Sequence, residues 1–284
     1  FTCAIPLTIG LILVTVAYRP FGAGRAAPGA QTLRIVHFNA LNVASSWDDA
    51  FVEWLLKQDA DLVALVDAPP GILERNQSLV DRYPHRVAPK RGWEWPILLL
   101  SKHPFRPVSL GPTTRETRTS FVARRSVVVT LPNGAEVLFT AMHPYSPRSE
   151  RAWNRAFEIV HRDAPLLRDA HERSNTPVIV AGDFNATPTG KIFRTFAQAA
   201  DLRASPTLPI GTWPASRPRL IGVAIDHVFA SPEVVHLARR VGPSFRSDHR
   251  PIVVDVAVPA PSPPQSPAPK SAPPPPEESP SSPD

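Results

Sequence analysis

The sequence predicts a mixed α/β fold, and three observations lead to this expectation. Short runs rich in β-branched and apolar residues alternate with segments of helical periodicity along most of the 284 residues. Two of these runs flank Pro132-Asn133-Gly134, a turn typical of an antiparallel hairpin. Other runs are separated by helices, which can serve as crossovers. Hairpins and crossovers together predict helical layers on mixed β-sheets rather than on a purely parallel sheet.

The expected elements follow in chain order. Strands are expected at residues 33–38, 61–66, 97–100, 126–131, 135–141, 178–181, 225–230 and 251–256. An amphipathic helix begins after Ser45-Ser46, which offer an N-cap, and it places Phe51 and Leu55 on one face. A second helix is expected at 148–168, where Pro165 should kink or shorten it, and a third at 191–199.

The two ends of the chain differ from the domain at 32–258. Residues 1–18 (FTCAIPLTIGLILVTVAY) carry no charge, and this length is near the lower limit of about 17–25 residues for a membrane-spanning helix. We expect a membrane anchor there, with a signal-peptide core as the alternative. Residues 19–31 form a linker. Residues 259–284 hold twelve of the 36 prolines and are expected to be a disordered tail. We expect a spacer or a wall-penetrating tail, with binding to a proline-recognising module as the alternative.

Net charge and cysteine content limit the kinds of partner and metal site that this chain can have. The formal net charge is +6, which suits phosphate-bearing partners such as nucleic acid or anionic lipid, although it also serves solubility alone. The one cysteine, Cys3, lies in the apolar N-terminal segment. An intrachain disulfide framework and a thiolate metal cluster are therefore excluded for this chain.

Polar side chains stand at the ends of the expected strands. If these strands lie side by side, the ends converge on one crevice, and Asp183 and Asn185 face the same side because they are two residues apart in an extended segment. An isolated Asp-x-Asn would more simply make a local turn, so the repetition along the chain carries the argument. The converging residues are Asn39, Asp67, His143, Asp183, Asn185, Asp226, Asp248 and His249.

This set of oxygen and nitrogen donors suits a hard divalent cation. Carboxylates and carboxamides bind Mg²⁺ or Mn²⁺, and Mg²⁺ is commonly held by one or two carboxylates together with substrate phosphate. A histidine next to such an ion can donate to phosphate, and an adjacent aspartate fixes its tautomer and raises its basicity.

The motifs VIVAGDFNATP, IDHVFAS and FRSDHRPIVVDV occur in this order, supported by LRIVHFN, LLLSKHPF and AMHPYSP. With these motifs, residues 33–258 resemble the endonuclease/exonuclease/phosphatase superfamily, and GTWPA resembles bacterial members that carry N-terminal membrane segments. The resemblance implies a four-layered α/β sandwich, in which two mixed β-sheets pack face to face with helices outside. It also implies a hydrolase that uses Mg²⁺ or Mn²⁺ to attack a phosphoester with water.

The resemblance also implies roles for residues. Asn39, Asp67 and Asp248 would bind the metal, directly or through water. Asp183 would orient or activate the attacking water, and Asn185 would help to hold the phosphate. His249, oriented by Asp226, would contact the scissile phosphate and act in acid–base chemistry, and His143 would bind it from the opposite side.

One position departs from the family pattern. The family usually has Leu-Gln-Glu where this chain has Leu65-Val66-Asp67, and aspartate is one methylene shorter than glutamate. We expect an active, nuclease-like phosphodiesterase. A sphingomyelinase-like phospholipid diesterase and a non-catalytic scaffold that keeps the fold are the alternatives.

Further expectations concern two other histidines, a basic cluster, the partners of the protein and its cellular compartment. His37 is expected to be an ordinary strand residue with a satisfied hydrogen bond, and His227 to point away from the crevice. The basic cluster Arg115, Arg118, Arg124 and Arg125 could bind phosphate or be a solvated face. We expect a phosphoester substrate, membrane attachment through the N-terminal segment, no obligate protein partner and a domain outside the bacterial cytoplasm.

Overall fold

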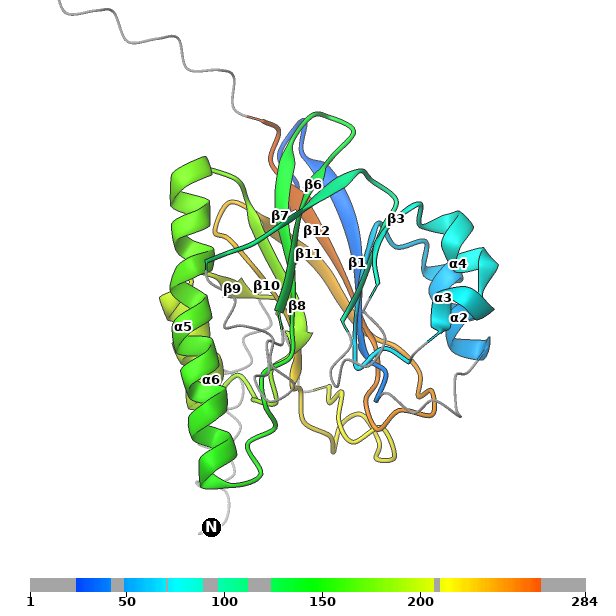
Figure 1. Ribbon diagram of the computed structural model, residues 1–284, viewed down its shortest axis with the longest axis vertical. Helices are drawn as coiled ribbons and strands as arrows, with labels where there is room; N and C mark the ends of the chain where they lie inside the picture. Colours follow the sequence, from blue (N-terminus) through cyan, green and yellow to red (C-terminus); the bar gives the residue numbers. More distant parts are fainter. Residues whose placement is uncertain are drawn as a thin grey trace, which may run out of the picture.

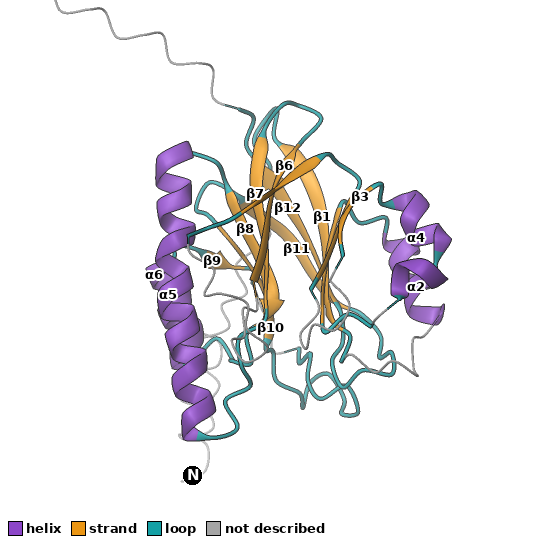
Figure 2. Ribbon diagram, viewed as in Figure 1, coloured by secondary structure: helices purple, strands orange, loops and turns teal. Residues whose placement is uncertain are grey.

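The computed structural model describes residues 24–41, 49–69, 71–88, 97–111, 124–206 and 210–261. Two six-stranded β-sheets pack face to face, and helices cover the outer face of each sheet (Figure 1, Figure 2). The expected four-layered α/β sandwich is confirmed. Residues 1–18, where an anchor is expected, and residues 262–284 of the proline-rich tail lie outside the described residues. Within the described ranges, no helix combines the length and apolar character needed to cross a membrane.

The first sheet joins strands from both ends of the domain. Its β1 pairs antiparallel with β12 and parallel with β2, so the sheet is mixed as expected. The strands, in spatial order, are β11 (Val235–Val241), β12 (Ile252–Val258), β1 (Gln31–Asn39), β2 (Leu62–Val66), β4 (Leu98–Ser101) and β3 (His85–Val87).

The second sheet contains the expected hairpin and a parallel crossover. β6 and β7 form the hairpin, and β7 pairs parallel with β8. The strands, in spatial order, are β5 (Phe105–Val108), β6 (Arg124–Thr130), β7 (Glu136–Met142), β8 (Val178–Asp183), β10 (Asp226–Ala230) and β9 (Arg203–Ala204).

Alternating side chains explain why both faces of these strands are buried. On β1, Ile35 belongs to the core between the sheets, whereas its neighbour Val36 packs in the cluster under the helices. Because successive side chains on a strand point to opposite faces, an apolar run fills both layers at once. The helices over the first sheet are α2 (Asp49–Gln58), α3 (Ile72–Arg75) and α4 (Gln77–Arg82).

The second sheet is covered by α5 (Glu150–Ser174) and α6 (Lys191–Ala199). The Ser149 hydroxyl accepts a hydrogen bond from the Ala152 amide and caps the N-terminus of α5. Pro165 lies inside α5, and the helix continues to Ser174, so the expectation that the proline shortens it is wrong. Buried residues on both sides of the proline, such as Ala164 and Leu167, outweigh the one lost backbone hydrogen bond.

Candidate active site

The sheet topology gathers the polar strand ends at one edge of the sandwich. The parallel pairs β1–β2 and β7–β8 end there, and β10 and β12 begin there because each is antiparallel to its neighbour. This edge lies at the bottom of Figure 1. Seven of the eight predicted site residues line a cavity of about 810 Å³ at this edge: Asn39, Asp67, His143, Asp183, Asn185, Asp248 and His249. The eighth, Asp226, is fully buried beside it.

The end of β8 is shaped by Gly182 and by a turn after Asp183. A Cβ atom at Gly182 would lie 2.1 Å from the carbonyl oxygen of Met142, so only glycine allows β7 and β8 to approach this closely. One carboxylate oxygen of Asp183 accepts a hydrogen bond from the Asn185 amide, and Asn185 adopts φ 49°. The Asn185 side chain donates to the Pro144 carbonyl, which ties it to the loop after β7.

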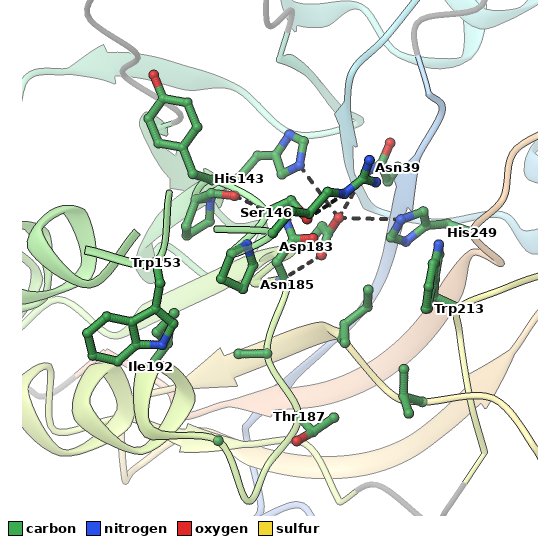
Figure 3. A pocket seen from close by; sticks show the side chains of 18 of the residues that line it. Asn39, His143, Ser146, Trp153, Asp183, Asn185, Thr187, Ile192, Trp213 and His249 are labelled. Carbon is green, nitrogen blue, oxygen red and sulfur yellow. Dashed lines mark hydrogen bonds and ion pairs between the residues drawn. The ribbon is translucent and has the colours of Figure 1, made fainter. Parts of the chain in front are cut away.

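Asp183 lies at the centre of the site. Its Oδ2 accepts a hydrogen bond of 2.9 Å from Asn39 Nδ2. The same oxygen lies 3.5 Å from His143 Nε2 and 3.5 Å from His249 Nε2 (Figure 3). Two imidazoles from different sheets therefore flank one carboxylate oxygen.

A buried relay of hydrogen bonds holds His249. Its Nδ1 lies 2.9 Å from Asp226 Oδ2, and the other oxygen of Asp226 lies 3.0 Å from His37 Nε2. His37 Nδ1 in turn faces the Ala64 carbonyl at 3.1 Å. His37 thus has the satisfied hydrogen bonds that were expected, but it also positions Asp226, a role that its place inside a strand did not indicate.

The carboxylates control the charge of the two imidazoles. Burial alone would lower the pKa of His249, but the nearby Asp226 and Asp183 outweigh it and raise that pKa to about 9. Burial likewise opposes protonation of His143, but the nearby carboxylates of Asp183 and Asp67 outweigh it and raise its pKa to about 10. Burial would raise the pKa of Asp183 and of Asp226, yet the charge of His249 holds both below the usual range.

Two carboxylate oxygens near the cavity lack a hydrogen-bond partner among the described residues. Asp67 Oδ1 has only a long contact of 3.4 Å with His143 Nδ1, and Asp248 Oδ1 is buried without a donor. The other oxygen of Asp248 accepts a 2.9 Å hydrogen bond from Trp213 Nε1. Unpartnered buried carboxylate oxygens are costly, and oxygens of this kind suit a hard divalent cation. Asn39 lines the same cavity, and its Oδ1 accepts a hydrogen bond from the Leu41 amide but keeps a second lone pair.

A second group of possible metal ligands is Asp183, Asp226 and His249, whose ligand atoms lie within 4.8 Å of one another. In this group, however, both oxygens of Asp226 already contact imidazole nitrogens. A cation placed there would have to displace these contacts. The unpartnered oxygens of Asp67 and Asp248 therefore fit a metal better, whereas Asp226 fits the role of orienting His249.

The family is decided by a comparison of the sequence with protein-family models. The model described as "Endonuclease/Exonuclease/phosphatase family" matches residues 37–249, which is most of the chain. The chain belongs to the endonuclease/exonuclease/phosphatase family. Members of this family are hydrolases, and they act on phosphoesters. A comparison with curated proteins finds no significant match.

Solved structures of family members share the fold. A family protein from Bacteroides thetaiotaomicron is 17% identical, with a TM-score of 0.61, over 82% of this chain and 97% of that one. The human Nocturnin catalytic domain with bound sulfate is 18% identical, with a TM-score of 0.59, over 81% and 97%. The Bacteroides thetaiotaomicron mannosyl-6-phosphatase is 18% identical, with a TM-score of 0.58, over 79% and 99%.

One wall of this family member's cavity combines aromatic rings with cations. Tyr145 and Trp153 line the cavity together with Arg148 and Lys191. Lys191 Nζ lies 5.5 Å from the centre of the Trp153 ring, and the Arg155 guanidinium lies 5.8 Å from that of Tyr145. These residues come from the loop after β7 and from the N-terminal turns of α5 and α6, and the sequence patterns did not indicate them.

The other candidates lie elsewhere. The side chain of Arg124 is buried and pairs with Asp163 of α5 at 3.3 Å, so this member of the basic cluster is not on a solvated face. Arg115 and Arg118 lie outside the described residues. His227 Nε2 faces the Ala186 carbonyl, and its ring packs against Phe193, on the helix side of the sheet rather than in the cavity.

Proposed function

We propose that the protein is a divalent-metal-dependent phosphodiesterase in which water attacks the phosphorus of a phosphodiester. The observation that carries the proposal is the single carboxylate oxygen of Asp183 with an imidazole 3.5 Å away on either side. This arrangement offers a site for a water next to a negative charge and donors for the oxygens of a phosphate.

Each residue has a separate task. The depressed pKa of Asp183 keeps its carboxylate ionised, so it accepts a hydrogen bond from the attacking water, orients it and takes up its proton as the new P–O bond forms. His249 and His143 have raised pKa values and stay protonated near neutral pH, so both donate to phosphoryl oxygens as negative charge develops. His249 also delivers a proton to the leaving oxygen, because Asp226 fixes the orientation of its ring.

Asn39, Asp67 and Asp248 would hold the cation. When bound there, Mg²⁺ or Mn²⁺ supplies positive charge that polarises the phosphoester. Asn185, which is fixed by its hydrogen bond to Pro144, has a second amide hydrogen available for the phosphate.

The aromatic and cationic wall supports an anionic substrate with a ring next to the scissile phosphate, as in a nucleic acid. Trp153 and Tyr145 offer ring faces, while Arg148 and Lys191 place positive charge beside them. The same charges disfavour a choline headgroup in this part of the cavity. A phospholipid diesterase remains the second candidate, favoured by the exposed apolar side chains at the cavity mouth.

The test is hydrolysis of plasmid DNA, a soluble phosphomonoester and sphingomyelin vesicles, each with Mg²⁺, Mn²⁺ or EDTA. His249→Asn is compared with His161→Asn, a matched change at an exposed histidine on α5. We expect metal-dependent cleavage of DNA that His249→Asn abolishes and His161→Asn preserves, and that falls as salt rises. Preferred cleavage of sphingomyelin would instead identify the phospholipid diesterase. A folded protein that binds no metal and turns over none of these substrates would identify the scaffold.

A further inference from the structure

Exposed large apolar side chains lie in the lining of the cavity and in the loop that contributes to it. Among the described residues, those with substantial exposure are Leu41, Leu220, Ile221 and Val223. Leu220 is 80% exposed and Ile221 is 71% exposed, and both lie in the loop before β10. Leu41 and Val223 line the cavity itself. This loop and the loop before β12 extend below the lower edge of the sheets (Figure 1).

The loop that carries Leu220 and Ile221 is held in place by its own backbone. Trp213 and Val223 form an antiparallel bridge, and the Gly211 amide donates to the Arg219 carbonyl at 2.7 Å. A Cβ atom at Gly211 would lie 2.2 Å from the backbone of Gly222, so the two arms of the loop touch. These backbone contacts hold the loop in a conformation in which two aliphatic side chains face solvent.

Arginines flank this apolar tip in the chain and in the loop that joins it. Residues 210–225 contain two arginines and no acid. Arg219 donates to the Gly242 carbonyl and Arg250 donates to the Ala215 carbonyl, which join the tip to the loop before β12. Four arginines of this loop and of the loop before β12 form no ion pair with a carboxylate in the described ranges: Arg217, Arg219, Arg246 and Arg250.

We infer that the Leu220–Ile221 tip inserts into the interface of an anionic lipid bilayer, with the surrounding arginines on the headgroups, so that the active-site cavity opens onto the membrane surface. In such an interface the acyl chains lie below the anionic phosphates. The aliphatic side chains would contact the acyl chains, and the arginines would contact the phosphates. Docking does not depend on the proposed hydrolysis, because it uses none of the residues assigned to the reaction.

A protein partner fits these residues less well. A second copy that docked through the same tip would bring two sets of unpaired arginines together, which is unfavourable. Stable protein interfaces also bury at least about 1,200 Å². Two protruding side chains supply only part of that area.

The test places an environment-sensitive fluorophore at the tip of the full chain. Cys3→Ser removes the one native thiol, and Ile221→Cys introduces the labelling site. Ser174→Cys is the matched control, because Ser174 is exposed at the C-terminal end of α5, at the opposite end of the sandwich. Because the label reports its own surroundings, any attachment through residues 1–18 does not mask the result.

Vesicles of phosphatidylcholine with phosphatidylglycerol should shift the emission at position 221 to the blue, and brominated lipid should quench it, with neither change at position 174. Pure phosphatidylcholine should give a smaller shift. Arg217→Gln with Arg246→Gln should require a larger anionic fraction for the same shift. Neither side chain forms a hydrogen bond among the described residues, so the two changes leave the fold intact.

Equal responses at positions 221 and 174, or no response at 221, would overturn the inference. A shift that depends on protein concentration without vesicles would overturn it too, and would make a second copy the occupant. Metal-dependent cleavage of plasmid DNA, measured on the same labelled protein, reports separately whether the proposed reaction fails.

Discussion

At the scale of single residues, Asp67 combines an unusual backbone with an unsatisfied carboxylate. It adopts φ 48°, and its Oδ1 is buried with no hydrogen bond among the described residues. A non-glycine residue in the left-handed region occurs where the surrounding structure imposes it, commonly at a functional site. Its position directly after β2 aims the carboxylate at the cavity between the two sheets.

We predict that Asp67→Asn raises the Mg²⁺ concentration for half-maximal activity by roughly 10–100-fold, because an anionic ligand becomes neutral. Asp67→Glu should lower that concentration, since the added methylene brings the carboxylate closer to the cation. Titrating the activity of each variant with Mg²⁺ measures both changes. An unchanged metal requirement in Asp67→Asn would show that Asp67 is not a ligand.

At the scale of elements, the contact between β7 and β8 sets the position of Asp183. Gly182→Ala would place a methyl group against the Met142 carbonyl, and neither backbone can move without disturbing the sheet. We predict a loss of roughly 1–3 kcal/mol in the free energy of unfolding, together with most of the activity. Gly134→Asn is the control, because Gly134 has φ 82° and open space and asparagine tolerates this conformation. Urea unfolding of both variants measures the difference.

A buried ion pair fixes α5 to the second sheet. Arg124 of β6 and Asp163 of α5 are both nearly inaccessible, and burial lowers the pKa of Arg124. Asp163→Asn would leave the guanidinium desolvated without its counter-charge, and we predict a loss of about 3–5 kcal/mol in the free energy of unfolding. Lys57→Ala breaks the exposed pair with Glu53 and should change little. A small effect of Asp163→Asn in chemical denaturation would show that water reaches Arg124.

At the scale of the whole molecule, the paired imidazoles make the stability of the metal-free protein depend on pH. His249 and His143 have folded pKa values of about 9 and about 10, above the unfolded value of about 6.5. Their contribution is fully present below the unfolded pKa and is lost as the pH rises through the folded values. We therefore predict that the free energy of unfolding in EDTA falls between about pH 6.5 and about pH 10.

Chemical denaturation at several pH values measures this dependence. Asp226→Asn should weaken it, because the carboxylate that holds the proton on His249 is gone. A wild-type protein that becomes more stable across the same pH window would contradict the assignment.

Most of the fold could be predicted from the sequence, and so could the set of residues at the cavity, because polar residues interrupt apolar runs at the ends of strands. His37 could not be assigned its role, since it depends on contact with Asp226, a residue 189 positions away on the other sheet. Strand β11 was missed because its side chains are only half-buried and carry two arginines. The cavity wall was missed because Arg148 and Lys191 are brought together only by the packing of α5 and α6.

The pairing of β1 with β12 has a consequence for how the protein is made. Gln31 lies opposite Val258, so the first sheet closes only when the last strand of the domain joins the first. His249 precedes this last strand, and Asn39 ends the first. During synthesis from the N-terminus, a nascent chain cannot assemble the active site until β12 has left the ribosome. Chains that end before β12 therefore lack the complete candidate site.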